Sequence, residues 1–337
     1  MRVLVTGGAG YVGGVSVDAI VAAGHQVTVL DDLTSGHGPS VNPAARLVVG
    51  SYGDGAATRE LLESAGIEAI LHCAARSIVG ESMTDPAKYY RDNVAGGITL
   101  LEAARAAGVG RLVFSSSAAV YGVPDATPID EDAPLRPINT YGETKRTFEA
   151  ALRWYGKAYG LRSVVLRYFN VAGATERLGE IHRPETHLIP NVLHALDGGP
   201  VLTLFGSDYE TLDGTPIRDY IHVSDLADAH LAALEATSPA DDRTGPVDGG
   251  PTEPLIANLG TSTGFSVRDV LSAAETIVGR PIPHTIGPRR AGDPPVLVAS
   301  NARAGAILGW QPRRSTLEAM IGSAWTWRRS HPHGYPD

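Results

Sequence analysis

The sequence predicts an α/β fold, a doubly wound parallel sheet with a smaller, interleaved C-terminal domain. Three observations predict it. Strand-like and helix-like patterns alternate through the first half of the chain, a glycine-rich turn separates the first strand from the first helix, and the alternation breaks down after about Gly173. Because alternating strands and helices build parallel sheets with helices on both faces, the first half should form the larger layered structure.

The predicted strands are short runs rich in β-branched and apolar residues. They lie at 2–6, 26–30, 46–49, 69–73, 111–115, 163–167 and 256–259. The spacing of apolar residues predicts a helix at 12–23 and another at 224–235. Since the last strand and the second helix lie far along the chain, we expect the chain to return to the first sheet after leaving it.

The length of 337 residues exceeds what one hydrophobic core usually organises, and 43% apolar residues suffice for two cores. We therefore expect two domains. The larger one covers 1–173, and the chain returns to it at about 221–264. The smaller one covers 174–220 and about 265–337.

The glycine-rich turn reads T-G-G-A-G-Y-V-G at 6–13, between a strand and a helix. In the Rossmann fold such a turn lets the backbone approach a pyrophosphate, and the helix N-terminus attracts the anion. Asp31 ends the second strand, where a carboxylate bonds the ribose hydroxyls and repels a 2′-phosphate. The sequence therefore predicts NAD as cofactor. The contacts expected in this region are Gly7, Gly10, Tyr11, Val12, Gly13 and Asp31.

A second motif, Y-G-E-T-K at 141–145, places Tyr141 and Lys145 on one face of a predicted helix. A free tyrosine is protonated at pH 7, and a nearby ammonium and a nicotinium cation would lower its pKa toward the working pH. Ser117 follows the strand at 111–115, at the sheet edge where ligands bind, and can bond the reacting oxygen. These three residues are the predicted catalytic group: a tyrosine base for an alcohol whose hydride passes to the dinucleotide.

Composition narrows the possible partners. A net charge of −9 argues against nucleic acid or a membrane surface, and no apolar stretch reaches transmembrane length. The first strand begins at the first residues, which leaves no room for a signal peptide, and the single cysteine, Cys73, has no internal disulfide partner. We therefore expect a cytoplasmic protein. We expect no metal at His182, His187 or His194, because no carboxylate or cysteine is expected to complete a ligand set.

Longer motifs resemble those of the extended short-chain dehydrogenase/reductase family, and within it the UDP-glucose 4-epimerases. The resemblance runs from end to end of the chain. Its motifs are V-G-E-S at 79–82, Y-Y-R-D-N-V at 89–94, S-S-S-A-A-V-Y-G at 115–122, L-R-Y-F-N at 166–170, R-D-Y-I-H-V at 218–223, P-R-R-A-G-D at 288–293 and the closing H-P-H-G-Y-P-D.

The resemblance implies further site residues. It makes Tyr141 the base, Lys145 its partner on the nicotinamide ribose, and Ser117 the second contact to the sugar O4. Asn93, Ser115 and Tyr168 are the further cofactor residues that it implies. The implied substrate residues are Ser117, Phe169, Asn170, His187, Phe205, Arg218, Tyr220, Arg290 and Asp293. His187 stands where other members of the family have an asparagine, and for Phe205 a place in the core is the alternative to stacking near the uracil. Two arginines supply forked donors to a diphosphate, and an aspartate accepts from ribose hydroxyls.

The reaction implied is inversion at C4 of a UDP-hexose, with UDP-glucose and UDP-galactose as main substrates. Hydride passes to tightly bound NAD and returns to the opposite face of a 4-keto sugar. The resemblance also suggests a homodimer that pairs two helices of each protomer. The adenine contact stays unassigned, because Gly50, Ser51 and Tyr52 stand where relatives carry an aspartate.

Alternatives remain open within and outside this class. UDP-N-acetylglucosamine is one alternative substrate, since Leu297 aligns with the residue that gates pocket size in the family. UDP-glucuronate is another, with Arg76 or another arginine of the pocket as the cation for its carboxylate. A 4,6-dehydratase would need an acidic pair where Ala118 and Ala119 stand. A non-catalytic NAD-sensing protein is the alternative from a different class, which the fold alone would allow.

Overall fold

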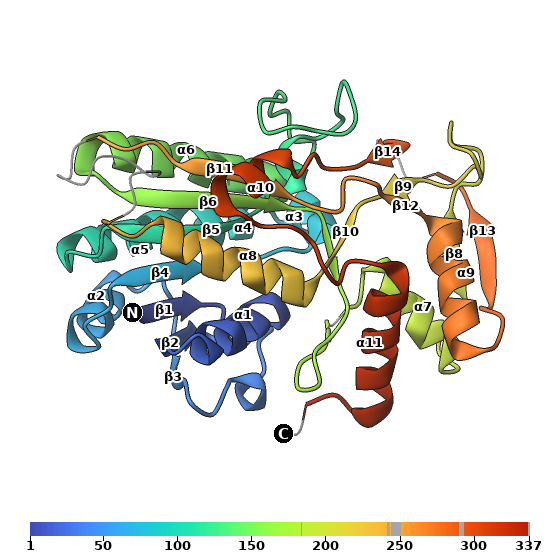
Figure 1. Cartoon of the computed structure of the whole chain (residues 1–337), viewed down its shortest axis with the longest axis horizontal. Coiled ribbons are helices and arrows are strands. Elements are labelled where there is room, and N and C mark those ends of the chain that lie inside the picture. Colours follow the sequence, from blue (N-terminus) through green and yellow to red (C-terminus); the bar gives the residue numbers. More distant parts are fainter. Residues whose placement is uncertain (183, 241–242, 244–250, 290–292, 336–337) are drawn as a thin grey trace.

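The computed structural model describes residues 1–182, 184–240, 243, 251–289 and 293–335. Within them, seven parallel strands form the main sheet in the order β3-β2-β1-β4-β5-β6-β11 (Figure 1). The strands are β1 (Arg2–Thr6), β2 (Gln26–Asp31), β3 (Arg46–Val49), β4 (Ala69–His72), β5 (Arg111–Ser117), β6 (Arg162–Tyr168) and β11 (Leu255–Leu259). The doubly wound sheet is confirmed, and the chain returns to it through β11, which pairs in parallel with β6.

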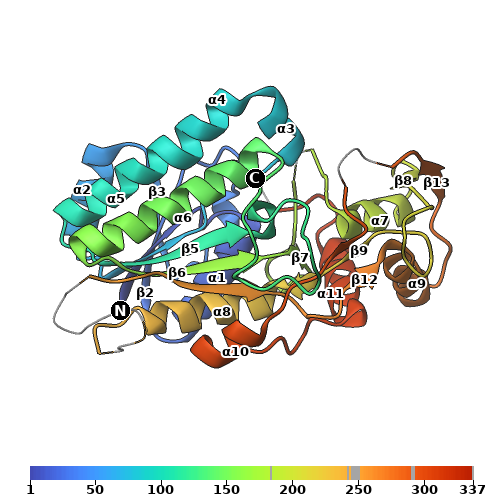
Figure 2. The ribbon, with the colours of Figure 1, turned by 90° about the horizontal axis from the view of Figure 1, so that it is seen from above.

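Helices cover both faces of this sheet (Figure 2). On one face lie α1 (Tyr11–Ala22), α8 (Val223–Ala236) and α10 (Ala302–Leu308); on the other lie α2 (Gly55–Ser64), α5 (Gly96–Ala106) and α6 (Thr140–Tyr159). Successive side chains of a strand point to opposite faces. Val3 and Val5 accordingly pack in the core beneath α1 and α8, while Leu4 packs in the core beneath α2, α5 and α6. The strands in the middle of the sheet are buried on both sides, as is typical of parallel sheets, whereas the edge strand β3 is partly exposed.

Helix α6 begins and ends at residues suited to those positions. The Asn139 side chain accepts a hydrogen bond from the Gly142 amide, which satisfies a donor left free in the first turn. The helix ends at Gly160, which has the left-handed φ of 70° that glycine tolerates. The cap fixes the first turn, so Tyr141 is held at the carboxyl edge of the sheet.

A second, smaller set of elements lies beside that edge (Figure 1). Its helices are α7 (Leu188–Leu196), α9 (Val267–Val278) and α11 (Leu317–Ser330). Its strands are β7 (Asn170–Ala172) with β10 (Tyr220–His222), β8 (Leu202–Phe205) with β13 (His284–Gly287), and β9 (Ile217–Arg218) between β12 (Phe265–Ser266) and β14 (Val296–Leu297). The three helices share a separate apolar core around Val192, Val270 and Met320.

Short helical segments connect the larger elements. They are the 3₁₀ turns Gly38–Ser40 and Ala118–Val120, the helices α3 (Val79–Thr84) and α4 (Pro86–Tyr89), and a π-helical segment, Tyr90–Ala95, that leads into α5. α10 contributes Ala304 and Leu308, and the following Trp310, to the core of the main sheet. We therefore propose that residues 302–310 belong with the larger domain, whereas the sequence assigned them to the smaller one.

Candidate active site

A cleft of about 1640 Å³ runs along the carboxyl ends of the strands, between the main sheet and the smaller set of elements. The turn from β1 to α1 forms one wall. A Cβ on Gly13 would lie 2.1 Å from the Gly7 carbonyl oxygen, and Gly7 has a φ of 73°. A Cβ on Gly10 would lie 3.4 Å from the Gly7 carbonyl oxygen, and Gly10 lines the cleft. The turn leaves bare backbone amides facing the cleft at a helix N-terminus, which fits a dinucleotide pyrophosphate.

Asp31 lies at the end of β2, beside this turn, and its side chain is buried. It accepts hydrogen bonds from the amides of Ala9 at 3.0 Å and Leu33 at 2.9 Å. Burial raises the pKa of Asp31, and the two amides oppose that shift. The carboxylate is therefore held rigidly at the position where a ribose would meet it.

Asp31→Asn is expected to lower the affinity for NAD about tenfold, because an amide accepts fewer hydrogen bonds and carries no charge. NAD content of the purified protein and fluorescence titration measure this. Asp32→Asn is the matched control: Asp32 is more exposed and pairs with Arg76 at 3.6 Å, so a smaller loss is expected. Equal losses in the two variants would contradict the role of Asp31.

The cleft brings together most of the predicted cofactor residues. Those that line it are Gly7, Gly10, Tyr11, Val12, Gly13, Asp31, Tyr141, Lys145 and Tyr168. Ser51, Tyr52 and Gly53 line the same end of the cleft, where the sequence assigned no contact. The sequence could have predicted these contacts, because the three residues follow the third strand at the carboxyl edge of the sheet.

Asn93 and Ser115 reach the site indirectly, because both are buried behind the cleft wall. The Asn93 side chain accepts from the Arg76 amide at 2.8 Å and donates to the Arg76 carbonyl at 3.0 Å, which fixes the loop after β4. The Ser115 hydroxyl lies 2.9 Å from His230 Nε2 and 3.2 Å from Cys73 Sγ. These contacts position neighbouring residues of the cleft wall, and the cofactor contacts that the resemblance implies for Asn93 and Ser115 stay a prediction.

The catalytic group of the prediction meets at the ends of β5 and α6. Ser117 is the last residue of β5, and Tyr141, 9% exposed, lies in the first turn of α6 and is hydrogen-bonded with Ser117. Lys145 is 3% exposed, and its ammonium donates to the Ser115 carbonyl at 2.7 Å. The Nζ atom lies 5.7 Å from the centroid of the Tyr141 ring. A phenol and a hydroxyl thus share one edge of the cleft, with a fixed cation behind them.

The pKa shifts differ from the expectation. Burial raises the pKa of Tyr141, and the hydrogen bond with Ser117 lowers it by less. Burial also lowers the pKa of Lys145 to about 8, with Cys73 and Glu149 opposing. The expectation was that Lys145 and the nicotinium cation of bound NAD together bring the tyrosine pKa toward neutrality; among the chain's own groups, burial has the largest effect on the pKa of Tyr141.

The same cleft brings together the predicted substrate residues. Ser117, Phe169, Asn170, His187, Phe205, Arg218, Tyr220 and Asp293 all line the cleft, and Arg290 lies outside the described residues. Arg218 forms an ion pair with Asp293 and donates to the Ile217 carbonyl at 2.7 Å. Tyr209 adds a hydrogen bond to Asp293 at 3.2 Å. Arg218 and Asp293 therefore form an ion pair in the cleft. The sequence resemblance assigns them to different parts of a nucleotide.

The reasoning that excluded a metal here was wrong in one respect. Two carboxylates, Glu180 and Glu185, lie against His182 and His187, and ligand atoms from all four side chains lie within 4.8 Å of one another. Sequence spacing did not reveal this because the segment between Thr175 and α7 is irregular. His194 lines the cleft but does not belong to this group.

Comparison with known proteins places the chain in a family. Residues 3–244 match the model of the NAD dependent epimerase/dehydratase family. The chain is 47% identical over 340 residues to a UDP-glucose 4-epimerase of Lactobacillus helveticus, which covers all of both chains. It also resembles the structure of a UDP-glucose 4-epimerase from Brucella ovis in complex with NAD, with a TM-score of 0.91 and 44% identity over 96% of this chain and 97% of that one.

A second solved structure extends the likeness to the substrate side. A UDP-glucose 4-epimerase from Bifidobacterium longum in complex with NAD⁺ and UDP aligns with a TM-score of 0.90 and 32% identity, over 99% of this chain and 100% of that one. The sheet order, the glycine turn and the whole-length matches agree with one another. The chain belongs to the NAD dependent epimerase/dehydratase family.

Proposed function

We propose that the chain is a UDP-glucose 4-epimerase, an isomerase that interconverts UDP-galactose and UDP-glucose with tightly bound NAD. One observation carries the proposal: Ser117 and Tyr141 lie in the same cleft as the glycine turn and the Arg218–Asp293 pair. The relatives that match the chain over its whole length are UDP-glucose 4-epimerases. A phenol between a dinucleotide site and a charged nucleotide site is suited to act on a sugar alcohol.

In this proposal the chain's residues bind the sugar nucleotide and move one proton. In its phenolate form, which Lys145 and the positive charge of bound NAD would favour, Tyr141 takes the proton from O4 of the hexose and later returns it, while the Ser117 hydroxyl bonds the same oxygen. Lys145, held by the Ser115 carbonyl, keeps a positive charge behind the phenol. Bound NAD supplies the hydride acceptor and donor at C4. Because the chemistry alternates between two faces of the sugar, the protein should grip the nucleotide more strongly than the hexose.

Arg218 and Asp293 are the proposed nucleotide anchor, joined by Arg290 on the strength of the sequence resemblance. Arg218 is 14% exposed in its side chain and Asp293 25%, so both are partly desolvated. An arginine in such a setting makes strong, charge-assisted bonds to a diphosphate. The aspartate can accept from ribose hydroxyls while it orients the arginine.

A coupled assay tests the function: UDP-galactose is supplied without added NAD, and UDP-glucose is measured. UDP-N-acetylglucosamine and UDP-glucuronate are assayed in parallel. Turnover of UDP-galactose supports the proposal. Turnover of only one of the other two sugars would replace the substrate, and no turnover of any sugar, even with NAD supplied, would reject the proposal.

Leu297 in β14 lines the cleft, half-buried, in register with Arg218. Leu297→Ala is expected to raise kcat/KM for UDP-N-acetylglucosamine relative to UDP-glucose about tenfold, because the removed methyl groups leave room for an acetamido group. Parallel steady-state assays of wild type and variant measure the ratio. Val296→Ala, at the neighbouring position outside the cleft lining, is the matched control. An unchanged ratio in Leu297→Ala would show that this side chain does not set hexose size.

Arg76 offers little support for the uronate alternative. Its guanidinium pairs with Asp92 at 2.9 Å and approaches Asp32 at 3.6 Å. A cation already shared by two carboxylates is poorly suited to binding a third, so a neutral hexose is the better fit.

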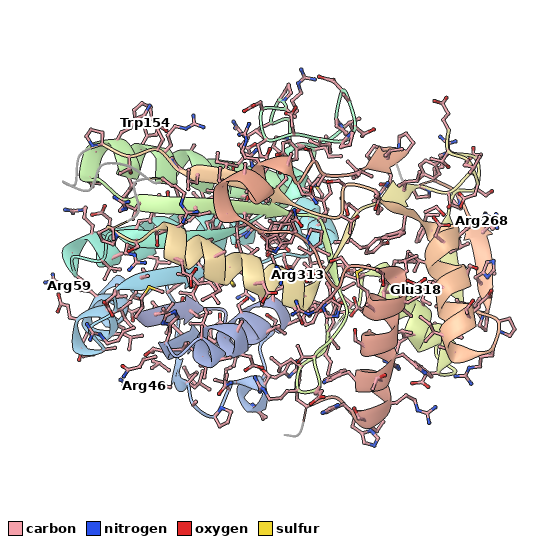
Figure 3. The ribbon with its side chains drawn as sticks, in the orientation of Figure 1. Arg46, Arg59, Trp154, Arg268, Arg313 and Glu318 are labelled. Carbon is pink, nitrogen blue, oxygen red and sulfur yellow. The ribbon has the colours of Figure 1, made fainter. Side chains whose placement is uncertain are left out.

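We also propose a homodimer formed through α5 and α6, which lie side by side on one face of the sheet (Figure 2). Trp154 projects from the outer side of α6 and is 65% exposed (Figure 3). An exposed tryptophan on a helix of this length is the kind of residue that anchors an interface. Light scattering after size exclusion measures the mass in solution.

None of the helices in the described part of the chain has the length and hydropathy of a bilayer span.

A further inference from the structure

The segment between residues 180 and 187 carries two Glu-x-His pairs, Glu180 with His182 and Glu185 with His187. We propose that these four side chains bind a divalent transition-metal ion, with zinc as the ion that fits best. Zinc prefers four nitrogen, sulfur or oxygen ligands in tetrahedral arrangement, and neutral imidazoles and carboxylates are among its usual ligands.

Distances within the cluster support a shared cation. Glu180 Oε1 lies 3.0 Å from His182 Nδ1 and 2.5 Å from His187 Nδ1. Glu185 Oε2 lies 3.9 Å from His182 Nδ1, and Glu185 Oε1 lies 3.6 Å from His187 Nδ1. Both imidazoles thus turn the same ring nitrogen toward two carboxylates. An ion among these atoms would be within reach of both imidazole nitrogens and of both carboxylates.

His182 supplies an independent observation. Its Nδ1 atom is buried and makes no well-aligned hydrogen bond, although Glu180 Oε1 is near. A buried nitrogen without a partner costs free energy, and a metal ion would satisfy its lone pair. The carboxylates are also withdrawn from water, with side-chain exposures of 6% for Glu180 and 8% for Glu185. Two buried carboxylates need compensating positive charge, which a divalent ion provides.

The backbone around the cluster is held in place without any ion. Gly179, next to Glu180, donates to the Tyr335 hydroxyl at 3.1 Å and accepts from it at 2.8 Å. At the other end, His187 precedes the first turn of α7, and Asn191 donates to its carbonyl at 2.8 Å. The Glu185 carboxylate accepts from the amide of His187 at 2.8 Å. A preformed ligand set lowers the ordering cost of metal binding.

All four side chains of the cluster line the cleft, so a bound ion would affect how the cleft contacts its substrate. A metal on Nδ1 leaves the other ring nitrogen of His187 protonated and able to donate. If the proposed function holds, that donor is available to the UDP diphosphate; this consequence rests on the proposed function, whereas metal binding does not. The two are tested by separate readouts.

The experiment uses full-length protein with its purification tag removed, dialysed against chelator and titrated calorimetrically with zinc chloride. Metal content is then measured by mass spectrometry, and cobalt(II) replaces zinc to give visible bands that report tetrahedral coordination. Wild type is expected to retain about one zinc per chain. Glu180→Gln and His182→Gln are expected to weaken zinc binding at least about 100-fold.

His194→Gln is the matched control, because His194 lies in the same segment of the cleft wall outside the cluster, and it should bind zinc as wild type does. Circular dichroism in chelator verifies that each variant is folded, and Glu185→Gln serves as a further arm if one of them is not. No zinc bound by wild type, or equal binding by wild type and the cluster variants, would overturn the proposal. Epimerase activity without zinc binding would reject the metal and leave the proposed function standing.

Discussion

Tyr141→Phe is expected to lower kcat for UDP-galactose about 10³-fold, because a positioned general acid–base contributes about 10²–10⁴ in rate. The phenylalanine keeps the ring in its buried position in the first turn of α6 and removes only the hydroxyl. Steady-state assays of wild type and variant measure the loss. NAD released by denaturation should be equal in the two proteins, since the ring remains in the cleft wall.

Ser117→Ala is the comparison that isolates the proton transfer. It removes a hydroxyl that hydrogen-bonds with Tyr141 but leaves the base in place, so a loss of about tenfold is expected. If Tyr141→Phe kept more than a tenth of wild-type kcat, or if the two variants lost equal activity, Tyr141 would not be the base.

Arg167→Met is expected to lower the free energy of unfolding by about 3–5 kcal/mol, because it leaves a buried carboxylate without its cation. Arg167 and Glu149 are 2% and 5% exposed in their side chains, and Nη2 lies 2.6 Å from Oε2. Arg167 also donates to the Tyr121 hydroxyl at 2.9 Å. Urea denaturation at one fixed NAD concentration measures the loss, because bound cofactor stabilises the folded state.

The double variant Arg167→Met with Glu149→Leu provides the control. It removes both charges, so it should recover most of the lost stability. A double variant less stable than Arg167→Met would contradict the account, because its loss would then come from packing and from the Ser116 hydrogen bond to Glu149. This buried pair ties α6 to β6 and thereby helps to hold Tyr141 at the edge of the sheet.

The sequence predicted the main sheet well because most of its strands are apolar runs buried on both faces, although the edge strand β3 is partly exposed. Val3, Leu4 and Val5, for example, are fully buried whichever face they point to. The glycine turn was equally clear, since its tight contacts admit no side chain at Gly13. These features depend on local chain geometry, which spacing along the sequence encodes directly.

The smaller set of elements was harder to predict, because contacts distant in sequence determine it. β9 has only the residues Ile217 and Arg218 and pairs with strands on either side that come from far along the chain. The contacts of Ser115 with His230 and Cys73 are of the same kind, because His230 lies more than a hundred residues further along the chain. The periodicity of the sequence does not predict such contacts. It also does not predict that Glu180 lies close to both His182 and His187.

The central claim is that hydrogen leaves C4 of the hexose as hydride, stays on the bound cofactor and returns to the same carbon. UDP-galactose carrying deuterium at C4 tests it, with conversion followed by NMR in ordinary water and no NAD added. The account predicts UDP-glucose that retains its deuterium at C4. Product that has exchanged this deuterium for solvent hydrogen would contradict it, because the C4 hydrogen would then have been removed as a proton.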